Sequence, residues 1–327
     1  MVKKIISIII AAIVLFYGFF NCSEKLSGYI LNQDNVIKNS EPAEVRLLLS
    51  KENRVISIKL EEYVKGVISG EMPLEYNIEA LKAQAVAART YAVAHMAGYK
   101  GRQYDKNNNI DLIDTVECQV YIDRKKCMES LPEGKRDEYM KKIDEAVDST
   151  KGEVITYEGN VISEPFFFSC SSGNTENSED VFSAAEPYLR SVDSAEDKKS
   201  PEYEKVVTFS NETFIKKINS AYSSSKLKNY NLKNQINIIS RSDSGSIKKI
   251  KVGAVTMTGL QFRSVLNLNS ANMDIKFYGS SVEIKSKGYG HGVGMSQCGA
   301  NYMAKDGKTY KDILKHYYQG VNVEKLI

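Results

Sequence analysis

Tryptophan is absent from this chain, histidine occurs only three times, and the formal net charge is no more than +3. Proteins that bind nucleic-acid phosphates usually carry a much larger basic excess, so we expect no nucleic-acid partner. Hydrophobic residues make up 42% and charged residues 26% of the 327 positions. Those fractions are ordinary for a globular protein that buries a sizeable core.

Several sequence signatures of catalysis are also missing. No GxSxG pattern is present, so the serine turn of many hydrolases is not supported. The chain also lacks the GxxxxGK(S/T) loop that binds nucleotide phosphates. Internal repeats are not visible. The chemistry must therefore be sought in isolated polar groups.

Cysteine occurs five times, an odd number without the spacing of a disulfide framework. Cys118 and Cys127 could pair, or could share a metal with His95. These ligands, however, lack the C-x2-C or i, i+3 spacing that is typical of zinc sites. We therefore expect no cofactor and no bound metal, with a zinc site as the alternative. Free or buried thiols are the simplest interpretation.

The N-terminus carries a long apolar run. Ile5–Phe20, "IISIIIAAIVLFYGFF", has no charged residue and follows Lys3 and Lys4. A spanning helix needs about 20 apolar residues, with about 17 as the lower limit. No small-residue cleavage site follows, which favours an uncleaved single-pass anchor over residues 1–22. The lysines should remain cytoplasmic and the rest of the chain should lie outside the membrane.

After the anchor we expect a linker over residues 23–43 and a single mixed α+β domain over residues 44–327. "VRLLLS" and "VISIKL" flank "KENR" as a β-hairpin does. The Ala-rich stretch "NIEALKAQAVAARTYAVAHMAG" predicts a long central helix. "CQVYI" is a strand candidate. Thr258 and Thr309 have the pattern of helix caps.

Glu71 lies in "SGEMP", at a break just before the Ala-rich helix. A carboxyl group held at such a junction can be partly desolvated, which raises its pKa and suits a general acid. An ordinary surface residue or a helix cap is the alternative. Arg89, further along, is the charged group of an otherwise small and apolar run, so it either pairs inward or reaches past the alanines to the surface.

Two further segments could line a site. "FFFSCSSGNTE" places the hydroxyl groups of Ser171, Ser172 and Thr175 after a hydrophobic strand, where they would hold a polar substrate or simply form a polar turn. "GYGHGVGMSQ" surrounds His291 with glycines that let the backbone approach a ligand or a neighbouring helix closely. Gln297, where a helix begins, could face the same site. A hydrogen-bonded, structural His291 is the alternative.

Three sequence blocks follow one another in this chain: "EYVKGVISGEMPLEYNIEALKAQAVAARTYA", "SSGNTE…PYLRSVDSAED" and "GYGHGVGMSQCGANYMAKDGKTYKDILKHYYQGV". Together and in this order they resemble the stage II sporulation protein D family, within the wider amidase-enhancer domain family. The resemblance spans about residues 45 to 325. It departs from part of the family in "NNNIDLIDTVECQVY", where some members have a His/Cys cluster and this chain has no histidine. Asn174 also stands where glycine is common.

The resemblance implies a lytic transglycosylase. Such an enzyme cuts the β-1,4 bond between N-acetylmuramic acid and N-acetylglucosamine in glycan strands stripped of stem peptides, during engulfment in sporulation. Glu71 matches the family's catalytic acid, and Arg89, Thr175 and Tyr188 match its polar site residues. We therefore expect the "GYGHGVGMSQ" segment to form one wall of the glycan groove opposite Glu71, with Gln297 facing a sugar acetamido group. A cell-wall amidase and a membrane protein of the engulfment complex are the implied partners. The expected location is the cell membrane, with the domain in the intermembrane space.

The lack of a clear second carboxylate fits this reaction. Ordinary glycosidases use two carboxyl groups. In a lytic transglycosylase the muramic 6-hydroxyl replaces water, so one carboxyl can act first as acid and then as base. The alternatives are a non-catalytic glycan-binding enhancer of an amidase and a scaffold that tethers a wall-degrading complex. An acid at position 71 favours the enzyme, because a binding groove does not need one.

Overall fold

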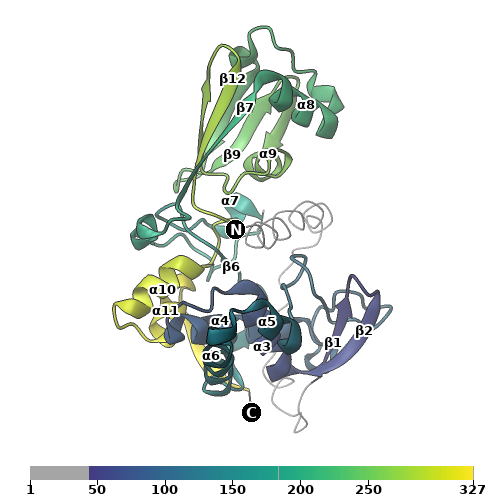
Figure 1. Ribbon diagram of the computed structural model, residues 1–327, viewed down its shortest axis with the longest axis vertical. Coiled ribbons are helices and arrows are strands. Elements are labelled where there is room, and N and C mark those ends of the chain that lie inside the picture. Colours follow the sequence, from purple (N-terminus) through teal and green to yellow (C-terminus); the bar gives the residue numbers. More distant parts are fainter. Residues whose placement is uncertain (1–43, 183, 327) are drawn as a thin grey trace. The chain divides into compact units, whose positions relative to one another are not determined.

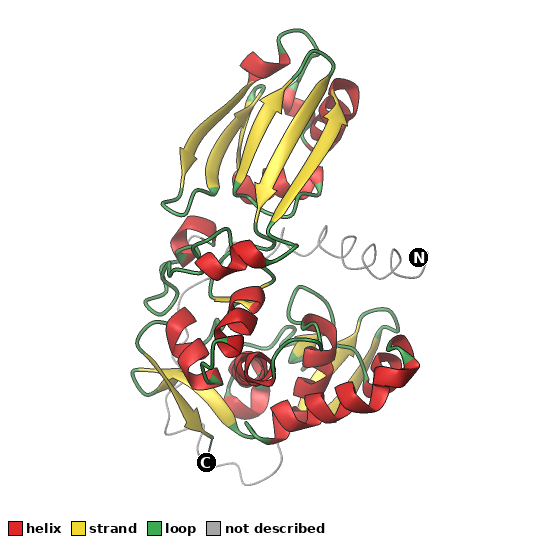
Figure 2. Cartoon of the chain, turned by 60° about the vertical axis from the view of Figure 1, so that its left-hand side comes forward, coloured by secondary structure: helices red, strands yellow, loops and turns green. Residues whose placement is uncertain are grey.

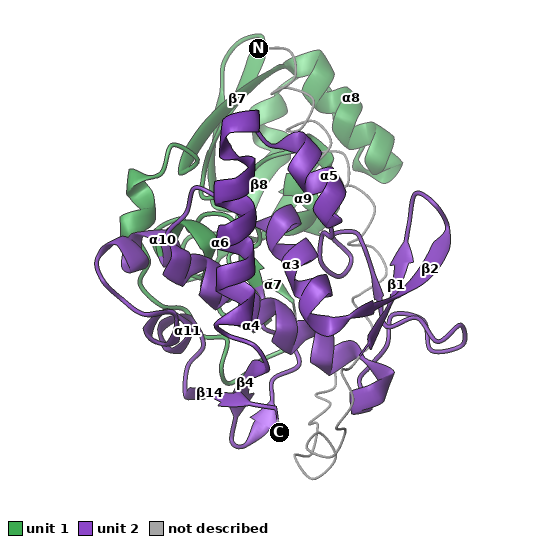
Figure 3. Ribbon diagram, turned by 60° about the horizontal axis from the view of Figure 1, so that its bottom comes forward, with its two compact units in different colours: residues 1–17, 167–299 green, residues 18–166, 300–327 purple. Residues whose placement is uncertain are grey.

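A computed structural model describes residues 44–182 and 184–326, and it confirms the α+β class for these residues. They form two compact units, coloured separately in Figure 3. We call residues 167–299 unit 1, and residues 44–166 with 300–326 unit 2. The sequence pattern did not indicate this division of the expected domain.

The predicted anchor and linker lie outside the described residues, so the structure does not address them. Within residues 44–182 and 184–326, none of the helices combines the length and hydropathy that a membrane crossing requires.

Unit 2 opens with the predicted hairpin. Strands β1 (Glu44–Leu49) and β2 (Arg54–Lys59) pair antiparallel, and Leu49 lies opposite Arg54 across the turn. Strand β3 (Leu112–Ile113) adds to β1 in parallel. Val45 and Leu47 point into the core, while Glu44 and Arg46 are exposed. The alternation is that of a sheet with one buried face.

The Ala-rich stretch forms α4 (Ile78–His95), as predicted, and Asn77 caps it by accepting from the backbone N–H of Glu79. Side chains all around this helix are buried, because α3 (Leu60–Glu71), α6 (Arg136–Asp148) and α11 (Tyr310–Tyr317) pack against it. Small alanine side chains allow such close approach on every side. Figure 1 shows α4 among these helices.

The rest of unit 2 surrounds this bundle. Strand β4 (Glu153–Tyr157) packs against α4 and pairs with β5 (Asn160–Val161) and β14 (Val321–Lys325). Helix α5 (Arg124–Ser130) contacts α3. Helix α10 (Gln297–Lys305) begins in unit 1 and ends in unit 2. The predicted cap at Thr309 is confirmed as a capping box with Asp312.

The predicted strand "CQVYI", residues 118–122, was wrong. This segment is irregular because its backbone groups bind helix α3 instead of a neighbouring strand. The N–H of Ile122 donates to the carbonyl of Gly66, and the N–H of Val120 donates to the Glu71 carboxylate. The Tyr121 ring occupies the space above Gly66, where an added Cβ would lie 2.1 Å from it.

Most of unit 1 is a lobe of two three-stranded sheets with helices on one face (Figure 2). One sheet has β10 (Val255–Thr258), β9 (Ile247–Val252) and β8 (Ile236–Arg241). The other has β11 (Met273–Phe277), β12 (Ser281–Lys287) and β7 (Glu204–Ser210).

Helices α8 (Asn211–Ala221) and α9 (Gly259–Leu266) cover the inner faces of these sheets. The rings of Phe214 in α8 and Phe262 in α9 pack edge to face in the core of the lobe, with their centroids 6.2 Å apart. The predicted cap of α9 is confirmed, since the Thr258 hydroxyl accepts from the N–H of Gln261 and the Gln261 side chain accepts in return.

Gly259 is the first residue of α9 and lies against β9. An added Cβ would lie 1.8 Å from the carbonyl oxygen of Ile247, a backbone atom that cannot turn aside. We therefore predict that Gly259→Ala lowers the free energy of unfolding by about 1–3 kcal/mol through overpacking. Gly134→Ala is the matched control, because nothing lies within 4 Å of its added Cβ. Equal denaturation midpoints for the two variants would contradict this packing.

Candidate functional site

The residues predicted to form one site are divided between the two units. Glu71 and Arg89 belong to unit 2. The others belong to unit 1: Ser171, Ser172, Thr175, Tyr188, His291 and Gln297. The groove wall predicted for the His291 loop, opposite Glu71, stays a prediction.

Glu71 is the last residue of α3, and the chain turns away at Met72 in an extended conformation. Its Oε1 accepts a hydrogen bond of 2.7 Å from the N–H of Val120. Gly70 makes room for this segment, because a Cβ there would lie 2.6 Å from the Val120 carbonyl oxygen. The Glu71 carboxyl is thus held at a fixed junction, as the sequence predicts.

Burial raises the pKa of Glu71 to about 7, and the hydrogen bond from Val120 opposes that rise with a smaller effect. A carboxyl with this pKa is largely protonated below pH 7 and readily deprotonated above it. Desolvation favours the neutral form because the surrounding protein solvates charge poorly. The group can therefore donate a proton and later accept one near neutral pH.

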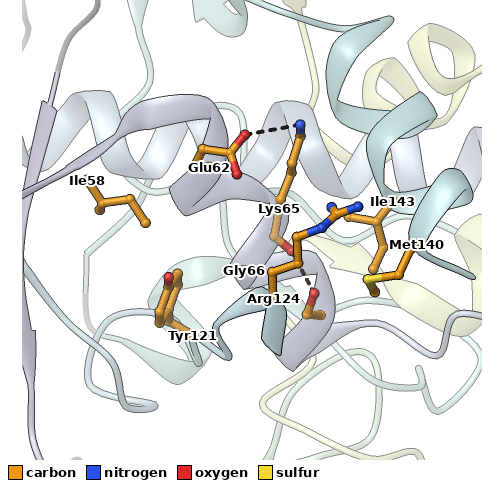
Figure 4. A pocket seen from close by; sticks show the side chains of 9 residues that line it. Ile58, Glu62, Lys65, Gly66, Tyr121, Arg124, Met140 and Ile143 are labelled. Carbon is orange, nitrogen blue, oxygen red and sulfur yellow. Dashed lines mark hydrogen bonds and ion pairs between the residues drawn. The ribbon is translucent and has the colours of Figure 1, made fainter. Parts of the chain in front are cut away.

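A small hollow lies on unit 2 between Tyr121, Gly66 and the side chains of α3 and α6 (Figure 4). Its cations are already paired. Lys65 Nζ lies 3.1 Å from Glu62 Oε1, and Arg124 Nη1 lies 2.7 Å from Asp144 Oδ1. Glu71 does not line this hollow. We assign no catalytic role to it.

Arg89 is completely buried in α4 and pairs inward, which decides between the two alternatives for this residue. Its Nη2 lies 2.6 Å from Glu61 Oε2, and its Nε donates to Glu61 Oε1 at 3.0 Å. Nη1 donates to the carbonyl of Glu153, and Nη2 to that of Val147. One guanidinium thus joins α3, α4, α6 and β4. A direct contact of Arg89 with substrate stays a prediction, and the buried pair shows how this residue positions α3.

The sequence blocks of unit 1 meet as adjoining segments. The N–H of Ser194 donates to the carbonyl of Gly173, and the N–H of Glu176 donates to that of Gly292. Strand β6 (Phe167–Phe168) pairs in parallel with β13 (Met295–Ser296). Short helix α7 (Ser178–Val181) follows the first block. The "SSGNTE", "DSAED" and "GYGHGVGMSQ" segments are therefore close in space, as the resemblance implies for a common site.

Asp197 is the residue of unit 1 that sequence reasoning missed. Its buried carboxylate accepts from the Ser171 N–H at 2.5 Å, the Ser296 hydroxyl at 2.5 Å and the Ser194 hydroxyl at 3.2 Å. Burial raises the pKa of Asp197 to about 6, although these bonds oppose the rise. One side chain thus ties the three blocks together. The sequence feature that could have pointed to Asp197 is its position in "DSAED", which belongs to one of the blocks that carry the family resemblance.

His291 is held by two backbone groups. Its Nε2 lies 3.0 Å from the Phe167 carbonyl oxygen, and its Nδ1 accepts from the N–H of Val293 at 3.1 Å. These contacts require the neutral ring with the proton on Nε2. Burial, together with a smaller effect of the Arg263 charge, lowers the pKa of His291 to about 3. These contacts fit the alternative of a hydrogen-bonded, structural His291, and its contact with a substrate stays a prediction.

The remaining predicted residues lie in unit 1, and several of them bind its neighbouring loops. Ser172 Oγ accepts from the Asn272 amide at 3.0 Å, and Ser171 Oγ accepts from the Gly173 N–H at 3.0 Å. Thr175 Oγ1 accepts from the Val192 N–H at 2.9 Å. Thr175, Tyr188 and Gln297 are buried. These hydroxyls therefore hold the loops together, and their contacts with a substrate stay predictions.

Within the described residues, Cys118, Cys127, Cys170 and Cys298 form no disulfide. His95 does not join Cys118 and Cys127. Its Nδ1 lies 2.8 Å from the Tyr91 carbonyl oxygen and its Nε2 lies 3.2 Å from Arg102. Among residues 44–182 and 184–326, no group of three or more His, Cys, Asp or Glu side chains could hold a metal ion.

Known proteins that resemble this chain match it over parts of both units. A family model described as stage II sporulation protein matches residues 49–157. Stage II sporulation protein D of Bacillus amyloliquefaciens is 41% identical over 285 residues, covering 86% of this chain and 79% of that protein. The protein of the same name in Bacillus subtilis (strain 168) is 39% identical over 287 residues, covering 87% and 80%. The chain belongs to the stage II sporulation protein D family.

The stage II sporulation protein D family also has a more distant relative. A Bacillus subtilis (strain 168) protein named amidase enhancer is 29% identical over 310 residues, which cover 80% of this chain and 40% of that protein. This likeness agrees with the wider amidase-enhancer resemblance seen in the sequence.

The pair of buried Arg89 and partly exposed Glu61 gives a stability prediction. Arg89→Met keeps most of the side-chain volume but removes the guanidinium donor from the Glu61 carboxylate and from two backbone carbonyls. We expect a loss of about 3–5 kcal/mol in the free energy of unfolding. Arg54→Met is the matched control, because Arg54 forms an exposed pair with Glu52 and should matter little. Chemical denaturation that finds the same loss for both variants would refute the assigned role of Arg89.

His291→Ala should lower stability by about 1–3 kcal/mol, because the partly buried Phe167 carbonyl and Val293 N–H lose their partner. The folded pKa of His291 lies below that of the unfolded chain, so its contribution is present above about pH 6.5 and is lost on acidification towards pH 3. The difference between wild type and variant should therefore shrink from pH 7.5 to pH 5. A difference that grows as the pH falls would be inconsistent with a neutral, buried imidazole.

Proposed function

We propose that this protein is a peptidoglycan lytic transglycosylase that cleaves the MurNAc-β-1,4-GlcNAc bond of stripped glycan strands. The observation that carries the proposal is the Glu71 carboxyl, fixed at the end of α3 with a pKa of about 7. Such a group suits a reaction that needs an acid and a base in turn. Membership of the stage II sporulation protein D family supports a role in sporulation.

One proton cycle accounts for the reaction. Protonated Glu71 donates its proton to the glycosidic oxygen as the bond from that oxygen to the anomeric carbon breaks. The resulting Glu71 carboxylate then accepts the proton of the muramic 6-hydroxyl while that oxygen bonds to the anomeric carbon. The products are a free 4-hydroxyl on N-acetylglucosamine and a 1,6-anhydromuramic end. Water is not consumed, and Glu71 ends protonated as it began.

The same proposal covers place and partners. We place the protein at the cell membrane through its N-terminal apolar run, with the described units in the intermembrane space of the sporulating cell. A cell-wall amidase would supply the substrate, because only amide hydrolysis removes stem peptides from the muramic lactyl group. A membrane protein of the engulfment complex is the second proposed partner.

A non-catalytic enhancer of a cell-wall amidase is the second candidate function. The relative named amidase enhancer favours it. In that case the units would hold glycan for a partner, and Glu71 would serve only to bind the Val120 segment. The two candidates differ in whether purified protein releases anhydro products.

Glu71→Gln separates the candidates. This change keeps the size of the side chain but removes the transferable proton, so we expect cleavage of stripped strands to fall by about 10²–10⁴-fold. Glu75→Gln is the matched control, because Glu75 is exposed four positions further along the chain. Mass spectrometry of the products, with melting temperatures for both variants, provides the readout.

The wild type and Glu75→Gln should release 1,6-anhydro fragments at similar rates. Cleavage by Glu71→Gln at the wild-type rate would rule out Glu71 as the acid. Absence of anhydro products from folded wild-type protein would favour the enhancer.

A further inference from the structure

Positive charge is concentrated in one part of unit 1. Residues 204–287, which we call the basic lobe, contain 14 Lys and Arg but only five Asp and Glu. The whole chain has 44 and 41, so everything outside the basic lobe is net acidic. A local excess of this size attracts polyanions, although the overall charge is small.

One largely exposed loop of the basic lobe has its backbone held by several hydrogen bonds to side chains. Residues 226–233, "KLKNYNLK", which we call the tyrosine loop, run between α8 and β8. Leu227 and Leu232 are buried in the lobe core and pin both ends. The Gln235 amide donates to the carbonyls of Lys228 and Tyr230, both at 2.8 Å, and its oxygen accepts from the Lys228 N–H.

Helix α8 supports the tyrosine loop from the other side. Asn219 accepts from the N–H of Leu227 at 3.0 Å and donates to its carbonyl at 3.1 Å. Asn211 donates to Asn229 at 3.0 Å. These contacts fix the backbone before any ligand binds, so little ordering cost remains for binding.

Tyr230 stands at the centre of the tyrosine loop with 82% of its surface exposed, the largest value among the exposed large hydrophobic residues of the described chain. Three exposed lysines surround it in sequence: Lys226, Lys228 and Lys233. The loop contains no acidic residue. A solvent-facing aromatic ring between cations, on a loop whose backbone is held by hydrogen bonds, contributes nothing to the core.

We propose that the tyrosine loop is a binding site for an acidic glycan strand. The Tyr230 ring offers a flat face for a sugar ring, the Asn231 amide can bond hydroxyl or acetamido groups, and the lysines attract carboxylates. Strands stripped of stem peptides have this chemistry, because removing the peptide frees the muramic lactyl carboxylate. The inference therefore takes its ligand from the proposed function and rests on it.

A lipid surface fits the tyrosine loop less well. Leu227 and Leu232 face the core, so Tyr230 is the loop's exposed large apolar side chain and nothing aliphatic is available for insertion. Membrane-binding segments usually combine lysines with several exposed apolar residues. Charge and a single ring suit a hydrated polymer better.

The test measures binding of fluorescently labelled, stripped glycan strands by full-length protein in neutral detergent. All proteins carry Glu71→Gln, so that strand binding does not depend on cleavage. Tyr230→Ala should weaken binding about tenfold, the scale on which one aromatic anchor contributes to an interface. Tyr278→Ala, which removes another exposed tyrosine of the basic lobe, should leave binding unchanged.

Charge is tested with two triple variants. Lys226→Gln/Lys228→Gln/Lys233→Gln should weaken binding and its dependence on salt. Lys216→Gln/Lys217→Gln/Lys276→Gln removes three exposed lysines elsewhere on the basic lobe and should have a smaller effect. Strands whose carboxyl groups have been amidated should bind wild type and the first triple variant alike. Melting temperatures confirm that each variant is folded.

Several results would overturn the inference. One is unchanged glycan binding by Tyr230→Ala. Another is an equal loss of glycan binding in the two triple variants. The third is that variants of the tyrosine loop lose binding to phosphatidylglycerol vesicles but keep their binding to glycan strands. The proposed reaction fails separately. Tyr230-dependent binding without anhydro products from protein with Glu71 intact would retire the reaction and keep the site. Anhydro products together with normal binding by Tyr230→Ala would do the reverse.

Discussion

The buried guanidinium of Arg89 is the constraint on which unit 2 depends. It bonds Glu61 of α3 and the carbonyls of Val147 and Glu153, and so fixes α3 against α4, α6 and β4. Glu71 ends the same helix that carries Glu61 in its first turn. The contact of Arg89 with Glu61, near the start of α3, therefore sets where the candidate acid Glu71 lies at the end of this helix.

Unit 1 uses polar groups in a similar way. Asp197 collects donors from three segments that are distant in sequence, and His291 bridges Phe167 and Val293 as a neutral ring. The glycines around His291 make these contacts feasible. Gly290 has φ of 121°, and a Cβ there would lie 2.7 Å from the Cβ of Phe168. The loop is thus built for close packing within unit 1.

Local features were predictable from the sequence, whereas long-range ones were not. The hairpin, the Ala-rich helix and the caps at Thr258 and Thr309 follow from patterns within a few residues. The Val120 segment was mistaken for a strand because its partners are Gly66 and Glu71, the latter 49 positions away. For the same reason the sequence indicated the inward pairing of Arg89 only as one alternative, and it did not reveal Asp197 or the division into two units.

The account depends on a Glu71 carboxyl that is protonated near neutral pH. The most direct measurement is its pKa, from a ¹³C-carboxyl NMR titration of folded protein, assigned by comparison with Glu71→Gln. A midpoint of about 7 is the predicted result. A midpoint near the ordinary glutamate value of about 4.3 would contradict the account, because the residue would then be a carboxylate with no proton to donate.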